Sequence, residues 1–114
     1  AAPEALFLNG TAAEAQNQAM TKDGDKFVIY NKLGAGNISF VDGNGTKYFA
    51  KDENDLFIGS PKTTVNPSEE GCITRITVDF STNKVKYESV SSDIKLVWAA
   101  VAPSEMFKQI CRRR

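Results

Sequence analysis

Glycine, asparagine, aspartate and serine residues interrupt this chain at short intervals, and no other feature of the sequence limits its fold as strongly. The segments between them have strand length, roughly 4–8 residues, and are rich in β-branched and aromatic side chains. No segment carries the sustained 3.6-residue periodicity of a long amphipathic helix. The pattern therefore predicts an all-β domain.

Seven or eight short strands in a chain of this length predict an immunoglobulin-like antiparallel β-sandwich. We expect strands at residues 5–9, 26–32, 37–42, 46–50, 56–58, 73–80, 84–90 and 94–101. The segment 84–90 alternates, with Val85 and Tyr87 on one face and lysines and Glu88 on the other, as in a sheet buried on one side. We assign residues 1–102 to the sandwich and 103–114 to a tail with the spacing of one short helix.

Two glycine-rich segments predict tight reversals. Residues 33–36 (LGAG) separate the second and third expected strands, and residues 42–45 (DGNG) separate the third and fourth. The sequence therefore predicts two successive hairpins, which place residues 26–50 in a three-stranded meander. Residues 12–19 and 60–70 are expected to be loops, the second because it contains Pro61 and Pro67.

Charge and hydropathy exclude several kinds of partner. Fourteen basic residues balance fourteen acidic ones, so no net field favours nucleic acid or a membrane surface. The longest apolar run, residues 96–102, has the length of a strand and falls far short of the roughly 20 residues that span a bilayer. We expect no nucleic-acid partner and no membrane insertion by this chain.

The two cysteines, Cys72 and Cys111, have neither a zinc-site spacing nor the spacing of a redox pair. A disulfide requires that their Cα atoms lie within about 7 Å, which the sequence does not indicate. We expect two free thiols, with Cys72 acting as a small buried apolar residue.

Catalytic chemistry finds little support in the residue types present. Histidine is absent, which removes the commonest general base and the commonest metal ligand. The acidic residues Asp52, Glu53 and Asp55, and the pair at 69–70, are expected to be solvated in loops. Two alternatives stay open: a glycosidase acid and nucleophile pair among these acids, and a Ca²⁺ loop at Asp52, Asn54 and Asp55, which is the better of the two. We expect no enzyme, no cofactor and no metal site.

Aromatic rings are the residues to consider for carbohydrate binding, since a sugar ring stacks its C–H face on an exposed aromatic ring. Tyr30, Tyr48 and Trp98 are the candidate platforms. Polar partners for the hydroxyl groups would come from Asn44, Lys47 and Asn54. Trp98 is also expected to be mostly buried, because its strand is apolar on both faces.

Residues 6–11 (LFLNGT), Met20 and residues 24–43 together resemble domains of the SusE and SusF-type outer-membrane lipoproteins of Bacteroidetes. Residues 70–85 are similar to the closing hairpin of those domains. Domains of that family often carry a tryptophan in the loop after the first strand, whereas residues 12–18 of this chain contain no aromatic residue.

This resemblance implies an immunoglobulin-like sandwich that binds polysaccharides such as α-glucans, or that spaces neighbouring domains of a surface protein. It also implies export to the cell surface or periplasm, with a lipid anchor outside this chain. The alternative is an adhesion or protein-interaction sandwich without sugar binding, which would use an exposed sheet edge to pair with a neighbour.

Overall fold

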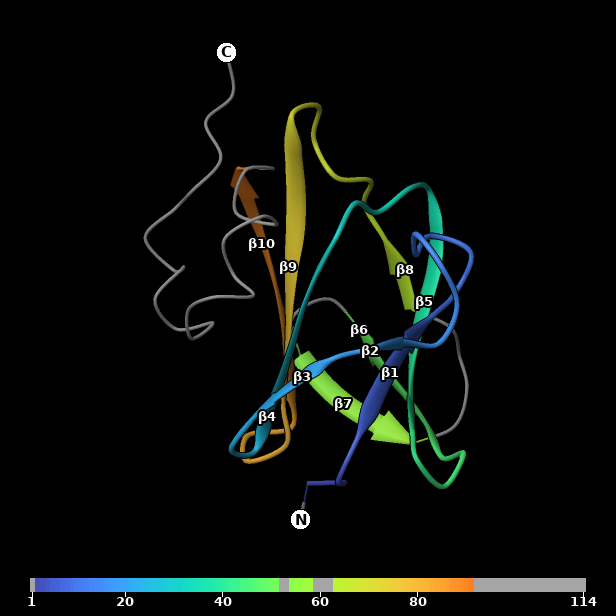
Figure 1. Ribbon diagram of the computed structural model, residues 1–114, viewed down its shortest axis with the longest axis vertical. Coiled ribbons are helices and arrows are strands. Elements are labelled where there is room, and N and C mark those ends of the chain that lie inside the picture. Colours follow the sequence, from blue (N-terminus) through green and yellow to red (C-terminus); the bar gives the residue numbers. More distant parts are fainter. Residues whose placement is uncertain (1, 52–53, 59–62, 92–114) are drawn as a thin grey trace.

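The chain folds into two antiparallel β-sheets packed face to face (Figure 1). The computed structural model describes residues 2–51, 54–58 and 63–91, with side chains described for residues 2–50 and 64–91. The predicted all-β, immunoglobulin-like sandwich is confirmed. The strands in the described residues are β1 (Leu6–Asn9), β2 (Gln18–Ala19), β3 (Thr21–Asp23), β4 (Lys26–Asn31), β5 (Gly36–Asp42), β6 (Lys47–Lys51), β7 (Asn54–Ile58), β8 (Thr63–Val65), β9 (Cys72–Asp79) and β10 (Lys84–Ser91).

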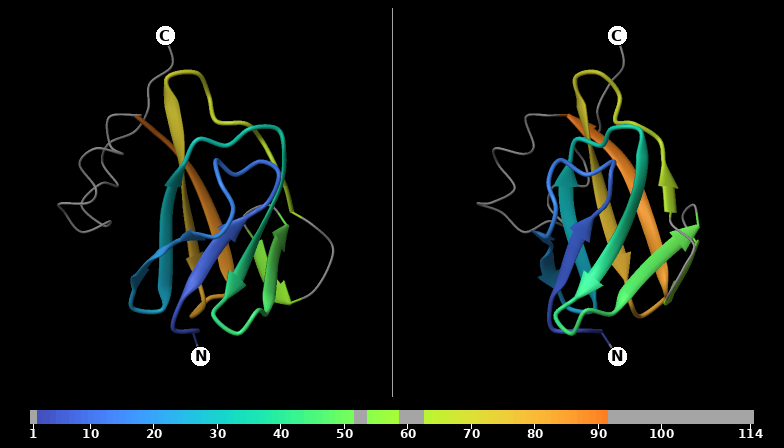
Figure 2. Two further views of the ribbon diagram at one scale, coloured as in Figure 1. Left: turned by 45° about the vertical axis from the view of Figure 1, so that its right-hand side comes forward. Right: turned by 90° about the vertical axis from the view of Figure 1, so that its right-hand side faces the viewer.

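The larger sheet has the order β2-β1-β5-β6-β7, with β8 paired to the first residues of β5. The smaller sheet has the order β10-β9-β4-β3. Figure 2 shows the two sheets as separate layers, with β4, β9 and β10 on one side and β1, β5 and β6 on the other. Every described strand pair is antiparallel, as expected for a β-sandwich.

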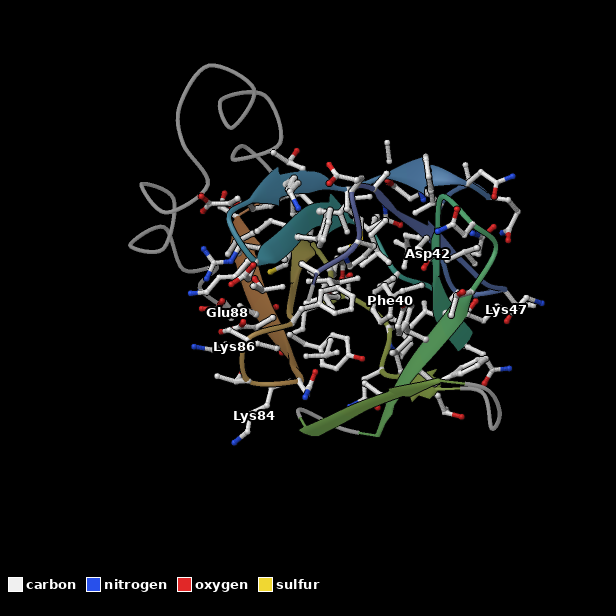
Figure 3. All side chains as sticks on the ribbon, turned by 90° about the horizontal axis from the view of Figure 1, so that it is seen from below. Phe40, Asp42, Lys47, Lys84, Lys86 and Glu88 are labelled. Atoms are coloured by element: carbon white, nitrogen blue, oxygen red, sulfur yellow. The ribbon has the colours of Figure 1, made fainter. Side chains whose placement is uncertain are left out.

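The main core lies between the two layers, and Phe40 points into it (Figure 3). Alternate residues of each long strand face this core, as the two-residue repeat of a strand requires. Its largest side chains come from both sheets: Leu6, Leu8, Phe27, Ile29, Ile38, Phe40, Ile76, Val78 and Val85. The rings of Phe27 and Tyr48 both meet Phe80 edge-on, at centroid distances of 5.8 and 5.3 Å.

The predicted hairpin between residues 26–32 and 37–42 is wrong. β4 pairs with β3 and β9 in the smaller sheet, whereas β5 pairs with β1, β6 and β8 in the larger one. Residues 32–35 therefore carry the chain from one layer to the other, and the predicted meander reduces to the β5–β6 hairpin, which β7 extends.

Residues 33–37 do not form a tight turn because their backbone groups bond to two segments that are distant in the sequence. The backbone of Gly34 donates to the carbonyl of Ala12, and the amide of Ala12 donates to the carbonyl of Asn37. Leu33 is buried, and both of its backbone polar groups bond to Ser68. The polar groups that a tight turn would pair with each other are thus taken by residues 12 and 68.

The two other hairpins agree with their sequence signals. β9 and β10 pair in register from Cys72–Ser91 to Asp79–Lys84, and Asn83 takes the positive φ of 56° that closes their turn. β5 and β6 are joined by residues 43–46, where Gly45 has a φ of 86°. Val85 and Tyr87 face the core, as the alternation in 84–90 predicts.

Short strands account for the remaining differences from the sequence prediction. β8 lies within the expected loop 60–70, and β2 ends the expected loop 12–19. The expected strand at 94–101 and the helical tail at 103–114 lie outside the described residues. No helix in the described part of the chain is long and apolar enough to cross a membrane.

The expectation of free thiols is wrong for Cys72, which is disulfide-bonded. Cys111, outside the described residues, is the only other cysteine of the chain and hence the only partner the chain offers. The sequence does not indicate how far apart these two cysteines lie in the fold, so it does not predict the disulfide.

Candidate functional site

Tyr30, one of the three predicted platforms, is only 2 % exposed. It lies on the face of the smaller sheet that points away from the main core, opposite Arg75 of β9. Burial raises the pKa of Tyr30 above its ordinary value, and this outweighs the lowering by the hydrogen bond and charge of Arg75. A ring so enclosed offers no surface on which a sugar could stack.

Tyr48, Asn44 and Lys47 lie together at the β5–β6 hairpin. Asn44 and Lys47 are exposed, but the Tyr48 ring is half-buried against Phe80. Figure 3 shows Asp42 and Lys47 on the opposite side of the molecule from Lys84, Lys86 and Glu88 of β10.

Asp42 organises this hairpin. Its Oδ1 accepts from the backbone amides of Asn44 and Thr46, both at 2.9 Å, and its Oδ2 accepts from the Tyr48 hydroxyl at 3.0 Å. Burial raises the pKa of Asp42, but these hydrogen bonds outweigh it and hold the pKa below its ordinary value. The Tyr48 hydroxyl thus has a structural partner within the turn.

The predicted platform is therefore not assembled from these residues. Tyr30 lies on the smaller sheet, whereas Asn44, Lys47 and Tyr48 lie on the larger one. Trp98 lies outside the described residues, and so does the side chain of Asn54, whose backbone begins β7. Every aromatic ring among the described side chains is buried or half-buried: Phe7, Phe27, Tyr30, Phe40, Tyr48, Phe49, Phe80 and Tyr87.

A pocket of about 390 Å³ lies between the segment 64–69 and the strands β9 and β10. Its volume falls within the range of small-molecule sites, roughly 300–1,000 Å³. The lining residues that carry hydroxyl, amide or carboxylate groups are Thr64, Asn66, Ser68, Glu69, Thr74, Tyr87, Glu88 and Ser89. Leu33, Val65 and Pro67 add apolar surface.

Ser68 holds one wall of this pocket in place. Its Oγ accepts from the Leu33 amide at 2.9 Å and lies 2.7 Å from the Thr74 hydroxyl. The Ser68 amide donates to the Leu33 carbonyl at 3.0 Å. At the other end of the segment, the Thr64 hydroxyl donates to the Asn37 side chain at 3.1 Å. The segment is thus anchored at both ends to β4, β5 and β9, so the pocket exists before any ligand binds.

The lining suits the binding of a neutral polar ligand better than its chemical conversion. Amide and carboxylate oxygens accept from sugar hydroxyls and serine and threonine hydroxyls both donate and accept, while proline and valine contact C–H faces. Glu88 is already paired with the Arg75 guanidinium, which neutralises one of the two carboxylates.

The described residues provide no set of donor side chains for a metal ion. Across residues 2–51, 54–58 and 63–91, no group of three His, Cys, Asp or Glu side chains lies close enough to hold a metal ion. The Ca²⁺ alternative at Asp52, Asn54 and Asp55 falls on side chains outside the described ones.

Sequence reasoning missed the pocket because its residues come from separate parts of the chain, around residues 33, 64–69, 74 and 87–89. The available signal was the loop 60–70, which is rich in Ser, Thr, Asn and Pro and joins two strands. Loops of this kind carry binding residues more often than the strands they connect.

No protein family, curated protein or solved structure matches this chain. The assignment of the site therefore depends on the pocket's own shape and lining.

Proposed function

We propose that this chain is a non-catalytic carbohydrate-binding domain of a bacterial surface protein that takes part in polysaccharide utilisation. The sugar would enter the pocket between residues 64–69 and the β9–β10 hairpin. One observation carries the proposal: a preformed pocket whose lining combines apolar surface with hydroxyl, amide and carboxylate groups. Histidine, the commonest general base, is absent from the whole chain, which favours binding over catalysis.

The proposed surface location has support in the cysteine chemistry. Disulfides persist in oxidising compartments, such as the periplasm and the cell surface, and are rare in the cytosol. The disulfide at Cys72 is thus consistent with an exported protein. The resemblance of residues 6–11, Met20, residues 24–43 and residues 70–85 to SusE and SusF-type domains points the same way.

Affinity electrophoresis tests the proposal, in native gels containing starch, glycogen or other polysaccharides. We expect at least one polysaccharide to retard the wild-type chain. Asn66→Ala and Glu69→Ala, which remove polar groups from the pocket, should weaken binding about 3- to 10-fold each, the usual effect of one lost hydrogen bond. Asn44→Ala and Lys47→Ala are matched controls, because these exposed residues lie at the β5–β6 hairpin and not in the pocket.

If Asn44→Ala and Lys47→Ala weakened binding while the two pocket variants did not, the sugar site would lie at the β5–β6 hairpin. Unchanged mobility of the wild-type chain in every gel would remove sugar binding altogether. A spacer or protein-interaction role would then remain, and the lack of a fully exposed ring among the described aromatic side chains favours that second candidate. A dimer mass, or a stable complex with a neighbouring domain of the parent protein, would support it.

A further inference from the structure

The core face of the smaller sheet changes from apolar to polar along its length. β4, β9 and β10 lie side by side in this layer, and their registers arrange the residues of that face in rows across the three strands (Figure 2). Two neighbouring rows consist of hydrophobic residues: Phe27, Val78 and Val85, then Ile29, Ile76 and Tyr87. The next row consists of Asn31, Thr74 and Ser89, all of them polar. We call these three residues the polar row.

The first member of the polar row has a structural explanation. A polar group on the core face of a sheet costs free energy unless it is hydrogen-bonded. Asn31 is fully buried, and its side chain accepts from the Glu14 amide at 2.9 Å and donates to the Gln18 side chain at 2.8 Å. Asn31 therefore anchors the loop before β2 and needs no ligand.

The second member, Thr74, is only partly accounted for by its neighbours. It is 8 % exposed and lines the pocket, and its Oγ1 lies 2.7 Å from the Ser68 Oγ. A threonine hydroxyl offers one donor site and two acceptor sites. The bond with Ser68 uses one of these three sites, whichever oxygen provides the proton. Thr74 therefore keeps at least one acceptor site for a ligand hydroxyl.

The third member, Ser89, has no structural partner in the described part of the chain. It is half-buried, lines the pocket and is the register partner of Thr74. Its hydroxyl makes no hydrogen bond to residues 2–51, 54–58 or 63–91. The polar row thus ends in the pocket with a hydroxyl that the fold itself does not use.

The spacing of Thr74 and Ser89 suits a sugar ring. Register partners on adjacent antiparallel strands have Cβ atoms roughly 4.5–5.5 Å apart. Hydroxyl groups bind each other at about 2.7–2.8 Å between oxygens. Two hydroxyls placed in this way can reach two neighbouring hydroxyls of one sugar residue. The described lining contains no lysine or arginine, so a sugar that carries a carboxylate or sulfate would meet no opposite charge there.

We propose that Thr74 and Ser89 are the specificity-determining residues of the pocket, and that their hydroxyls bind two neighbouring hydroxyls of one neutral sugar residue. This inference rests on the proposed sugar binding and adds the class of ligand, a neutral sugar with adjacent free hydroxyl groups. Val65 and Pro67, on the segment 64–69, supply the apolar contact for its C–H groups.

Native gels that contain the polysaccharide retarding the wild-type chain test the two residues. Ser89→Ala should weaken binding about 3- to 10-fold, the usual effect of one lost hydrogen bond, at an unchanged midpoint of urea unfolding. Thr74→Val keeps the shape of the side chain without its hydroxyl and should weaken binding by a similar factor. Because Thr74→Val also removes a partner of Ser68, urea unfolding of the same sample gives its folded fraction. Ser89→Ala carries the test by itself where Thr74→Val does not fold.

Two matched variants remove a hydroxyl from a strand without touching the pocket. Ser39 is a half-buried serine on β5 of the larger sheet, and Thr77 is a half-buried threonine of β9. Thr77 lies on the opposite face of β9 from Thr74, because it is three residues away along the strand. Ser39→Ala and Thr77→Val should bind polysaccharide as the wild type does.

Changing the ligand gives a second readout. Partial O-methylation of the same polysaccharide removes hydroxyl donors but keeps the sugar rings and their linkages. We expect the wild-type chain to bind the methylated form several-fold more weakly than the native form. The double variant Thr74→Val/Ser89→Ala should discriminate less between the two forms, because it lacks the hydroxyls that make the distinction. Alginate, in which every sugar residue carries a carboxylate, should not retard the wild-type chain.

The outcomes separate this inference from the proposed function. If Asn66→Ala and Glu69→Ala weakened binding while Ser89→Ala and Thr74→Val bound as the wild type does, the assignment of the polar row would be wrong and sugar binding in the pocket would stand. Retardation by alginate as strong as by a neutral polysaccharide would overturn the class of ligand. A wild-type chain that no polysaccharide retards would overturn both proposals.

Discussion

At the scale of single residues, Gly10 is the position where the backbone tolerates least change. Its φ is +125°, and a Cβ atom there would lie 2.1 Å from the Asn37 carbonyl oxygen and 2.6 Å from the Ile38 Cα. Both contacts are with backbone of β5, which cannot rotate aside as a side chain can. Gly10 thus has a packing role that its place after the first strand does not reveal from the sequence alone.

We expect Gly10→Ala to lower the free energy of unfolding by more than about 2 kcal/mol, because strain and clash add. Urea denaturation measures it. Gly43→Ala is the control, since its Cβ would meet nothing within 4 Å, and it should change the stability by no more than about 0.5 kcal/mol. Equal effects of the two changes would show that the contact with β5 is not formed.

Asp42 makes the stability of the β5–β6 hairpin depend on pH. Its pKa in the folded chain lies below the ordinary value of 3.8, so the ionised form is favoured by folding. The resulting stabilisation is fully present above the pKa of the unfolded state and is lost as the pH falls through the folded value. Asp42→Asn should therefore be less stable than wild type at pH 6, and the difference should shrink as the pH falls below 3.8.

Urea denaturation of both proteins at pH 6, 4 and 2.5 checks this expectation. Asp25→Asn serves as the comparison, because Asp25 is an exposed acid at another turn. A gap between wild type and Asp42→Asn that stays constant across this range would mean that the hydrogen bonds to Asp42 do not depend on its charge.

At the scale of elements, sequence prediction succeeded where a strand pair is closed by its own turn. The β9–β10 hairpin was predicted with its alternation, because the turn at Ser81–Asn83 and the period-2 pattern of 84–90 are local. The β4–β5 connection was predicted wrongly, since its outcome depends on residues 12 and 68, far away in the chain. Glycine at 34 and 36 permits a tight reversal but does not require one.

Hydrogen bonds of Ser68 link the pocket wall to β4 and β9. Ser68→Ala removes the acceptor for the buried Leu33 amide and the partner of the Thr74 hydroxyl. We expect a loss of about 1–3 kcal/mol in unfolding free energy, the usual cost of a buried polar group left unpaired. Hydrogen exchange at the Leu33 amide should become faster in the same variant.

Ser89→Ala is the matched control for this change. Ser89 lines the same pocket, but its side chain makes no hydrogen bond to any described residue. Its removal should leave both the stability and the Leu33 exchange rate near wild type. If Ser68→Ala behaved in the same way, the wall would be held by backbone hydrogen bonds, those of β8 and of the residue 68 amide, without the Ser68 hydroxyl.

At the scale of the whole molecule, the fold class was predictable but the candidate site was not. The alternation of short apolar segments with turn residues predicts a sandwich, because burying one face of each strand leaves few other arrangements. The pocket depends on how β8 pairs with β5 and on how the segment 64–69 then lies against β10. No local pattern encodes that juxtaposition, and the same holds for the disulfide at Cys72.

Burial on both faces of the smaller sheet also explains why Tyr30 was misjudged as a platform. Its strand reads Phe27-Val28-Ile29-Tyr30, apolar at every position, which is the signature of a strand covered on both sides. A strand with one wet face would have alternated, as β10 does near Lys84 and Lys86.

Trp98 decides whether the predicted strand at residues 94–101 contributes a core ring or a sugar platform to the whole molecule. If its ring is buried, as the apolar residues on both faces of that predicted strand indicate, Trp98→Ala should cost about 3–5 kcal/mol in unfolding free energy. The variant should then lose polysaccharide binding only in proportion to the fraction unfolded. Asn66→Ala provides the contrast, because it should weaken binding at nearly unchanged stability. Denaturation curves and affinity gels on the same samples separate the two. A Trp98→Ala protein that unfolds at the wild-type urea concentration, yet no longer binds polysaccharide, would make Trp98 the platform and the pocket at residues 64–69 a secondary feature.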